Sequence, residues 1–216
     1  LNTGGLMFCP VGSDFVAEVV AKGKGVTTLQ VGDRVIPNDH FPFSLSPQSL
    51  PGIPSNYASK EYDIFHFSKL IKIPDQMSDE VAASFTIGAQ TSYSMVRKLE
   101  INPEHNNILV TSAKSNTSLY AIAALRSSGA NVYATSTSTS FNKELLEMGV
   151  KEVFIVDPKS TNFLEHKGIA DLVKSTGGFN GVIDPFFDLH IGKLIDTMSY
   201  FGRYVTCGLY DQYTSI

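Results

Sequence analysis

The pattern of hydrophobic and polar positions changes near residue 75. Before that point, short β-branched runs alternate with turn residues. Phe15–Ala21 alternates apolar and polar side chains, Gly23–Gly25 is a turn, and Arg34–Ile36 follows a Gly-Asp pair. Tyr62–Phe67 and Leu70–Ile73 are predicted as two further strands. The first part of the chain is therefore expected to be a small, barrel-like β domain.

After Pro74 the pattern becomes an alternation of helices and strands. Ser78 is a helix N-cap followed by two acidic residues, which predicts a helix to about Leu99. Strands are then predicted at residues 108–112, 132–135, 153–156, 181–184 and 204–207, and helices at 118–128, 142–148, 169–175 and 191–200. Strands that alternate with helices predict an α/β fold with a doubly wound, parallel sheet of the Rossmann type.

Composition excludes several classes of protein. The chain has 216 residues, 43% of them hydrophobic, and a formal net charge of −4, so it has enough apolar material for a core and is not globally disordered. No dense basic stripe predicts nucleic-acid binding, and no apolar run predicts a membrane span. Cys9 and Cys207 cannot form a disulfide framework, and no signal peptide is visible, so a reducing, cytoplasmic location is expected.

Several motifs together resemble the medium-chain dehydrogenase/reductase superfamily. They are Gly12–Phe15 with GKGVTTLQVGDRVIP, the run LIKIPDQMSDEVAA followed by Thr91 and Tyr93, the run VIDPFFD, and GRYVTCG. The resemblance implies part of a GroES-like catalytic domain at residues 1–92, with a variable loop at 37–56, and a Rossmann-like nucleotide-binding domain at residues 93–216. Compared with full-length members, the chain is expected to be incomplete at both ends and to lack the last strand of the nucleotide sheet.

The resemblance also favours the branch without zinc. The zinc enzymes of the superfamily carry His and Glu directly after the glycine that matches Gly12, whereas this chain has Ser13 and Asp14. A further ligand cysteine is expected near Ile87, and the loop at 37–56 has no cysteine for a structural zinc site. We therefore predict no bound metal.

The expected phosphate-binding turn lacks every glycine of the dinucleotide-binding fingerprint. After the strand at 108–112 the sequence is Ala113-Lys114, then Ser115, Asn116, Thr117 and Ser118. Hydroxyl groups, backbone amides and a helix N-terminus can all donate to a phosphate. An ordinary helix-capping cluster that binds nothing is the alternative interpretation.

The end of the second strand of the nucleotide domain indicates NADP rather than NAD. An NAD enzyme places a carboxylate there for the ribose 2′-hydroxyl. This chain has Ser136 and Thr137 in a run of hydroxyl residues, followed by Lys143, and Lys114 is a second candidate for the positive charge that meets a phosphate. A polar, low-complexity loop without a ligand is the alternative.

The remaining site residues follow from the resemblance. It places Thr91 beside the nicotinamide and Asp184 and Gly208 at the cofactor crevice, where Phe186 and Phe187 replace small residues. Asp14 and Tyr57 are candidates for the proton donor, and the catalytic residue stays unassigned.

The leading hypothesis is an NADPH-dependent, zinc-independent oxidoreductase that reduces an activated double bond or carbonyl, of the quinone or enoyl reductase type. The alternatives are a non-catalytic binding protein with a degenerate phosphate turn, and a zinc alcohol dehydrogenase. The expected partner is a small-molecule substrate, with no nucleic acid and no membrane, and the resemblance allows a homodimer of the full-length protein.

Overall fold

The computed structural model describes residues 12, 14–38 and 58–211. The chain divides into two compact units, Leu1–Gln90 and Thr91–Ile216. The boundary predicted from the sequence lies two residues further along, between residues 92 and 93.

The described part of the first unit contains a small antiparallel sheet. Its strands are β1 (Ala17–Glu18), β2 (Arg34–Pro37) and β3 (Leu70–Lys72), with β2 in the middle. Helix α1 (Asp79–Leu99) begins in this unit, and the Ser78 hydroxyl accepts a hydrogen bond from the amide of Val81, as expected for an N-cap. Its core consists of Ile36, Ile73 and Ala82, packed against Val16, Met77 and Phe85.

Two strand predictions in this unit are wrong in extent or in kind. The strand expected at Phe15–Ala21 is reduced to the two residues of β1. The segment Tyr62–Phe67 is not a strand: it is irregular and runs into the 3-10 helix η1 (Phe67–Lys69). Ile64 is 97% exposed, and no strand among the described residues pairs with this segment, so its β-forming composition is not satisfied by a described sheet partner.

The second unit is built on a five-stranded, wholly parallel sheet. The strand order is β6-β5-β4-β7-β8. The strands are β4 (Asn107–Val110), β5 (Asn131–Ser136), β6 (Glu152–Ile155), β7 (Phe179–Asp184) and β8 (Met198–Thr206). The chain winds from β4 outward to β6, then returns to the other side of β4, so strand order reverses between β4 and β7.

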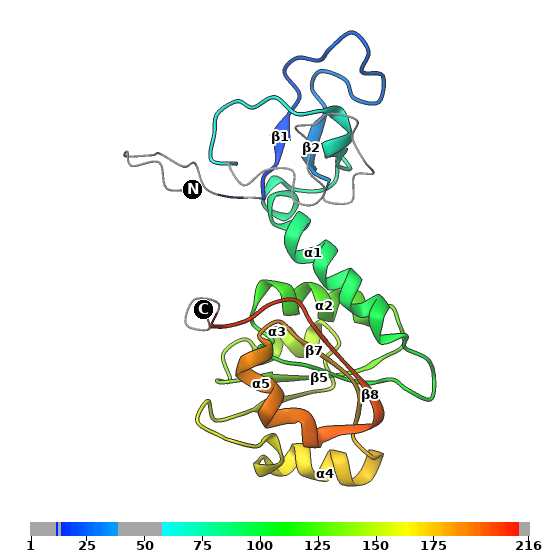
Figure 1. The fold of residues 1–216 in the computed structure, drawn as a ribbon, viewed down its shortest axis with the longest axis vertical. Helices are drawn as coiled ribbons and strands as arrows, with labels where there is room; N and C mark the ends of the chain where they lie inside the picture. Colours follow the sequence, from blue (N-terminus) through cyan, green and yellow to red (C-terminus); the bar gives the residue numbers. More distant parts are fainter. Residues whose placement is uncertain (1–11, 13, 39–57, 212–216) are drawn as a thin grey trace. The chain divides into compact units, whose positions relative to one another are not determined.

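Helices cover both faces of this sheet. They are α2 (Asn116–Arg126), α3 (Asn142–Glu147), α4 (Lys167–Thr176) and α5 (Phe187–Leu194), with the 3-10 helices η2 (Phe163–Glu165) and η3 (Ile195–Thr197). One core joins the sheet to α2, α3 and the end of α1, and a second core joins it to α4 and α5. Figure 1 shows the sheet between α2 and α4. The predicted doubly wound α/β fold is confirmed.

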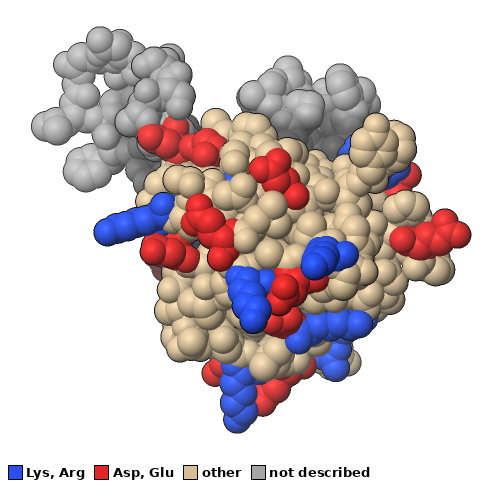
Figure 2. Space-filling view, turned by 90° about the horizontal axis from the view of Figure 1, so that it is seen from below, with Lys and Arg blue, Asp and Glu red and all other residues tan. Residues whose placement is uncertain are grey.

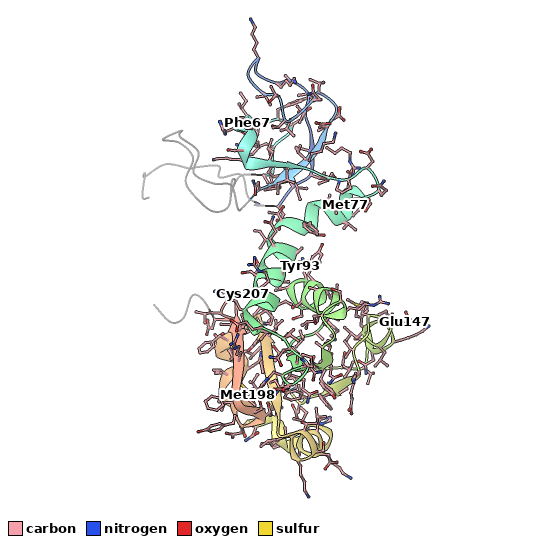
Figure 3. All side chains as sticks on the ribbon, turned by 90° about the vertical axis from the view of Figure 1, so that its right-hand side faces the viewer. Phe67, Met77, Tyr93, Glu147, Met198 and Cys207 are labelled. Carbon is pink, nitrogen blue, oxygen red and sulfur yellow. The ribbon has the colours of Figure 1, made fainter. Side chains whose placement is uncertain are left out.

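The helix predicted at residues 191–200 is placed wrongly. Helix α5 begins four residues earlier, and the chain enters β8 at Met198, so Tyr200 lies in a strand. The start of this long strand is irregular: its pairing with β7 shifts register between Phe179 and Gly181, and Phe201 has a φ of 62°. Figure 3 labels Met198 near one end of β8 and Cys207 just beyond the other.

Positive and negative side chains are intermixed on one face of the molecule (Figure 2). On the face shown in Figure 2, Lys and Arg lie beside Asp and Glu rather than in a separate patch. Within the described residues, no helix combines the length and the apolar character that crossing a bilayer requires.

Adjacent glycines after α4 provide a stability test. Gly177 ends the helix with a φ of 80°, and a Cβ added to it would point into open space. A Cβ on Gly178 would instead lie 2.7 Å from both the Ser199 amide nitrogen and the Thr197 carbonyl oxygen. We expect Gly177→Ala to lower the free energy of unfolding by about 1 kcal/mol, through left-handed strain alone. Gly178→Ala adds a backbone clash and should cost about 3 kcal/mol. Urea unfolding of both variants measures the difference, and equal losses would contradict the packing of this turn.

Candidate functional site

The turn after β4 is closed without glycine. Ser112 takes the left-handed conformation, with a φ of 47°, that a glycine adopts more easily. The Ala113 amide donates to the carbonyl oxygen of Thr135 on β5 (3.0 Å), and the Ser115 amide donates to that of Ser112 (2.8 Å). The turn is thus fixed to the neighbouring strand before it reaches α2.

Serine side chains hold the first turn of α2. Ser115 is the N-cap: its hydroxyl oxygen accepts from the Ser118 amide (3.2 Å) and donates to the Ser118 hydroxyl (2.9 Å). The fully buried Ser118 hydroxyl donates in turn to the carbonyl oxygen of Thr111 (2.8 Å). Ser115 and Ser118 therefore build the turn. Asn116 and Thr117 lie at the start of the helix, where backbone amides have no intrahelical acceptor and can bind an anion.

A lysine from this turn meets hydroxyl groups that follow β5. The Lys114 ammonium donates to the hydroxyl of Ser138 (2.8 Å) and to that of Ser140 (3.2 Å), and these two hydroxyls lie 2.8 Å apart. Among the described residues, no carboxylate forms an ion pair with Lys114. The three side chains define a polar, positively charged cluster at the carboxyl ends of β4 and β5.

The other residues predicted for the cofactor phosphate have different roles. Ser136 is buried, and its hydroxyl donates to the backbone carbonyl of Ser138 (2.9 Å), while Thr137 is exposed. Lys143 is 85% exposed on α3 and lies 3.8 Å from Glu147. The structure therefore does not bring Lys143 to Lys114 and Ser138.

Asp184 is the polar centre of the crevice between β4 and β7. Its side chain is fully buried, and one oxygen accepts hydrogen bonds from the Thr111 hydroxyl (2.7 Å), the His190 Nδ1 (2.9 Å) and the Phe186 amide (3.0 Å). The Tyr204 hydroxyl donates to the other oxygen. Burial acts to raise the pKa of Asp184, but the bonds from His190, Thr111 and Tyr204 outweigh it, so this pKa is lowered.

Asp184 also affects the groups around it. Burial and the adjacent carboxylate together raise the pKa of the Tyr204 hydroxyl. Local desolvation and the same negative charge raise the pKa of the Cys207 thiol, which disfavours a thiolate nucleophile. Both groups remain protonated at neutral pH.

The segment after β8 closes the same end of the sheet. The carbonyl oxygen of Gly208 accepts hydrogen bonds from the Phe187 amide (3.1 Å) and the Thr206 hydroxyl (3.3 Å). A Cβ on Gly208 would lie 3.2 Å from the Pro185 carbonyl oxygen, so a small residue is favoured here. Thr91 is half-buried on α1, at the start of the second unit.

The positions compared with zinc ligands lie together in the first unit. The Ile87 amide donates to a carboxylate oxygen of Asp14 (3.0 Å), and burial raises the pKa of Asp14 while that bond lowers it less. Within the described residues, no group of three His, Cys, Asp or Glu side chains is arranged to hold a metal. Ser13, Tyr57, Cys9 and the loop at 39–56 lie outside the described residues.

The first unit also contains a cavity of about 680 Å³ between the segment around β1 and residues 58–70. Apolar side chains such as Phe15, Val20 and Ile64 line it. None of the predicted cofactor-binding residues contributes to its wall, so the cavity is a feature of the first unit alone.

Sequence reasoning missed five residues of the crevice: Thr111, Ser138, Ser140, His190 and Tyr204. The hydroxyl run that contains Ser138 and Ser140 is evident in the sequence, but its contact with Lys114 depends on two neighbouring strands ending together. His190 follows Asp184 by six residues, and Tyr204 lies on the adjacent strand. Only the three-dimensional pairing of β7 and β8 brings these groups to one carboxylate.

Comparisons with known proteins agree with this architecture. No protein-family model matches the chain. A mycocerosic acid synthase-like polyketide synthase of Mycolicibacterium smegmatis is 29% identical over 208 residues, which is 94% of this chain and 9% of that protein. An L-threonine 3-dehydrogenase of Francisella philomiragia is 31% identical over 114 residues, covering 47% of this chain and 32% of the enzyme.

Solved structures give the same result. An NAD-dependent alcohol dehydrogenase superposes with a TM-score of 0.77 and 25% identity, covering 94% of this chain and 61% of its own. The CurK enoyl reductase superposes with a TM-score of 0.67 and 21% sequence identity, covering 93% of this chain and 55% of its own. A mycobacterial protein complexed with NADPH superposes with a TM-score of 0.70 and 21% sequence identity, covering 92% of this chain and 56% of its own. The structural neighbours of this chain are thus medium-chain dehydrogenases and reductases, and they match it over more than nine tenths of its length.

The two units agree with the folds of these neighbours. A partial GroES-like domain followed by a Rossmann-like domain is consistent with these neighbours. The chain spans less than two thirds of the relatives and structures that it matches, from 9% of the polyketide synthase to 61% of the alcohol dehydrogenase.

The Asp184 hydrogen bonds predict a specific pH dependence of stability. Asp184→Ala leaves three side-chain donors unpaired and should lower the free energy of unfolding by about 3–5 kcal/mol at neutral pH. Because the pKa of Asp184 is lowered in the folded state, its contribution is fully present above the unfolded value of 3.8 and is lost as the pH falls through the folded value.

Urea unfolding of wild type and variant, at neutral pH and at about pH 3, tests this expectation. The stability difference should shrink at the lower pH. Tyr204→Phe is the matched control, because it removes one donor and should cost about 1.5–3 kcal/mol. An acid-independent difference between wild type and Asp184→Ala would show that the carboxylate charge does not stabilise the fold.

Proposed function

We propose that the protein is an NADPH-dependent, zinc-independent oxidoreductase that reduces an activated double bond or carbonyl of a small molecule. The observation that carries this proposal is the cluster of Lys114, Ser138 and Ser140 at the carboxyl ends of β4 and β5. Doubly wound folds bind dinucleotides at this edge of the sheet, and the end of the second strand contacts the adenosine ribose. The Lys114 ammonium contacts two hydroxyls and, among the described residues, forms no ion pair with a carboxylate. Its positive charge is therefore suited to bind a 2′-phosphate.

The residues present fit a dinucleotide at two further points. The amides at Asn116 and Thr117 begin α2 beside Lys114 and would hold the pyrophosphate. Asp184 has both carboxylate oxygens engaged by protein donors, so the crevice holds a compensated charge rather than one that would repel phosphate. The serine hydroxyls close the turn that glycines close elsewhere, which supports a role for its free helix N-terminus in phosphate binding.

NADPH, when bound, supplies a hydride, and the acceptor takes that hydride on one atom and a proton on another. The chain's own contribution is to fix the cofactor and to orient it toward the acceptor. No described side chain is assigned as proton donor: the Tyr204 hydroxyl is committed to Asp184, and the pKa of Cys207 is raised. Water is the proton source that this arrangement favours.

The names of the relatives support the reaction class. An enoyl reductase and a quinone oxidoreductase are among the similar structures, and one neighbour was solved as an NADPH complex. Alcohol and threonine dehydrogenases are also similar, so the fold alone does not select the acceptor. The zinc-free assignment rests on Ser13 and Ile87, which by the resemblance replace two ligands of the zinc enzymes. The Asp14 carboxylate beside them accepts a hydrogen bond from the Ile87 amide.

Selectivity between NADPH and NADH tests the proposed cofactor. Full-length protein should bind NADPH at least tenfold more tightly than NADH, because charge-assisted hydrogen bonds to the 2′-phosphate contribute about 1.5–3 kcal/mol. Lys114→Gln should remove this preference by weakening NADPH alone. Ser138→Asp should reverse it by placing a carboxylate beside the phosphate. Fluorescence titration of wild type and both variants with each cofactor measures these affinities.

Lys143→Gln is the matched control, because that ammonium faces Glu147 instead of the cluster. Its NADPH affinity should stay within about twofold of wild type. Equal affinity of the wild type for NADH and NADPH would defeat the NADPH assignment. Binding of neither cofactor would instead favour a non-catalytic member of the superfamily.

The zinc content of the protein tests the zinc-independent assignment. Purified full-length protein should contain no stoichiometric zinc and should keep its activity after dialysis against a chelator, because the side chain at Ile87 cannot ligate a metal. Elemental analysis by mass spectrometry measures the zinc content. One zinc per chain that disappears in Asp14→Asn would place the protein with the zinc enzymes.

A further inference from the structure

Aromatic side chains gather at the carboxyl ends of β7 and β8. The rings of Phe186 and Tyr210 are 6.0 Å apart and nearly perpendicular, and those of Phe187 and Tyr204 are 5.9 Å apart in the same arrangement. Edge-to-face pairs of this kind stabilise each other beyond simple burial. We call the four residues the aromatic shelf.

The shelf is fixed in place by backbone hydrogen bonds. The carboxylate of Asp188, in the first turn of α5, accepts from the amides of Tyr210 (2.6 Å) and Asp211 (2.9 Å). The Phe187 amide donates to the carbonyl oxygen of Gly208 (3.1 Å). The segment after β8 is therefore hydrogen-bonded to the start of α5, and this keeps the rings of Phe186 and Tyr210 in contact.

Part of this apolar surface faces solvent. Phe187 is 39% exposed and Tyr210 68% exposed, and the adjacent Leu209 is exposed too. Contiguous exposed apolar surface on a folded protein usually contacts a ligand or a partner. The backbone of the shelf is fixed by hydrogen bonds, and two of its rings are exposed to solvent. This combination is suited to bind an apolar group.

The position of the shelf selects the occupant. Strand order reverses between β4 and β7, and a dinucleotide lies across that point with one half on each side. Lys114 and Ser138 mark the adenosine half, beyond β4 and β5. The shelf lies beyond β7 and β8, in the half that receives the nicotinamide, and Thr111 and Asp184 join the two halves through one hydrogen bond of 2.7 Å. A molecule that accepts a hydride must lie against this second half.

We propose that Phe187 and Tyr210 are specificity-determining residues that hold the apolar substituent of the hydride acceptor, so that acceptors with a long alkyl or aromatic group are selected over small ones. This inference rests on the proposed function. In the reaction considered, the hydride of NADPH forms a C–H bond at the β-carbon of an enone, the C=C π bond breaks, and the α-carbon takes a proton from water. NADPH is oxidised to NADP⁺, and the enone is reduced to the saturated ketone.

A homologous series of alkyl vinyl ketones tests the proposal. With full-length protein and saturating NADPH, kcat/KM should rise by about threefold to fourfold for each added methylene, as expected for burial of a methylene group. Phe187→Ala and Tyr210→Ala should flatten this rise, so that kcat/KM falls progressively further below wild type as the alkyl chain lengthens. The loss should appear mainly in KM, because the reacting atoms are unchanged.

Tyr200→Ala is the matched control. Tyr200 is an aromatic residue of β8 that is 87% exposed and lies near the end of the strand remote from Tyr210, and its removal should leave the dependence on chain length intact. Titration with NADPH and thermal melting accompany each variant. The two shelf variants should keep wild-type NADPH affinity.

Three results would overturn the proposal. The first is a wild-type kcat/KM that does not change with chain length although NADPH binds and ketones are reduced; this defeats the shelf and leaves the proposed function standing. The second is a set of shelf variants that melt at lower temperature but retain the full dependence on chain length, which would mean that another part of the protein covers the shelf. The third is a wild type that binds no NADPH, which defeats both proposals together.

Discussion

The buried carboxylate of Asp184 is the interaction on which the second unit depends. A charge with no exposure to water is tolerated only when donors surround it, and Asp184 receives them from β4, from the turn before α5, from α5 itself and from β8. These hydrogen bonds hold together the carboxyl ends of three strands. The turn from Ser112 to Ser118 and the aromatic shelf lie on the two sides of Asp184, so both depend on its hydrogen bonds.

The sequence predicted the architecture better than the site. The alternation of strands and helices after Pro74 follows from local patterns, and the structure has the predicted parallel sheet. Predictions failed where the partner decides the outcome. Ile64 lies in a β-forming run that stays irregular, and no described strand pairs with it. Tyr200 lies in a strand because the chain pairs with β7 at Met198 and again from Arg203 onward, which prevails over helical periodicity. The contact between Lys114 and Ser138 needs two strand ends side by side, which no spacing in one sequence reveals.

The candidate site also shows how one fold tolerates different turn chemistry. Glycine permits a tight turn because it has no Cβ, whereas here Ser112 accepts the left-handed conformation and Ser118 fills the space next to Thr111 with a hydrogen bond. The strand, turn and helix arrangement therefore forms here without the glycine fingerprint.

Replacing glycines with hydrogen-bonded serines changes the entropy of the turn as well as its contacts. A glycine-rich loop samples many conformations when the chain is unfolded, and it must be ordered again when a phosphate arrives. The turn from Ser112 to Ser118 has fewer accessible conformations in the unfolded chain and is closed in the folded one by its own side chains. The phosphate binding that we propose would then require little further loss of conformational freedom, because the turn is already ordered.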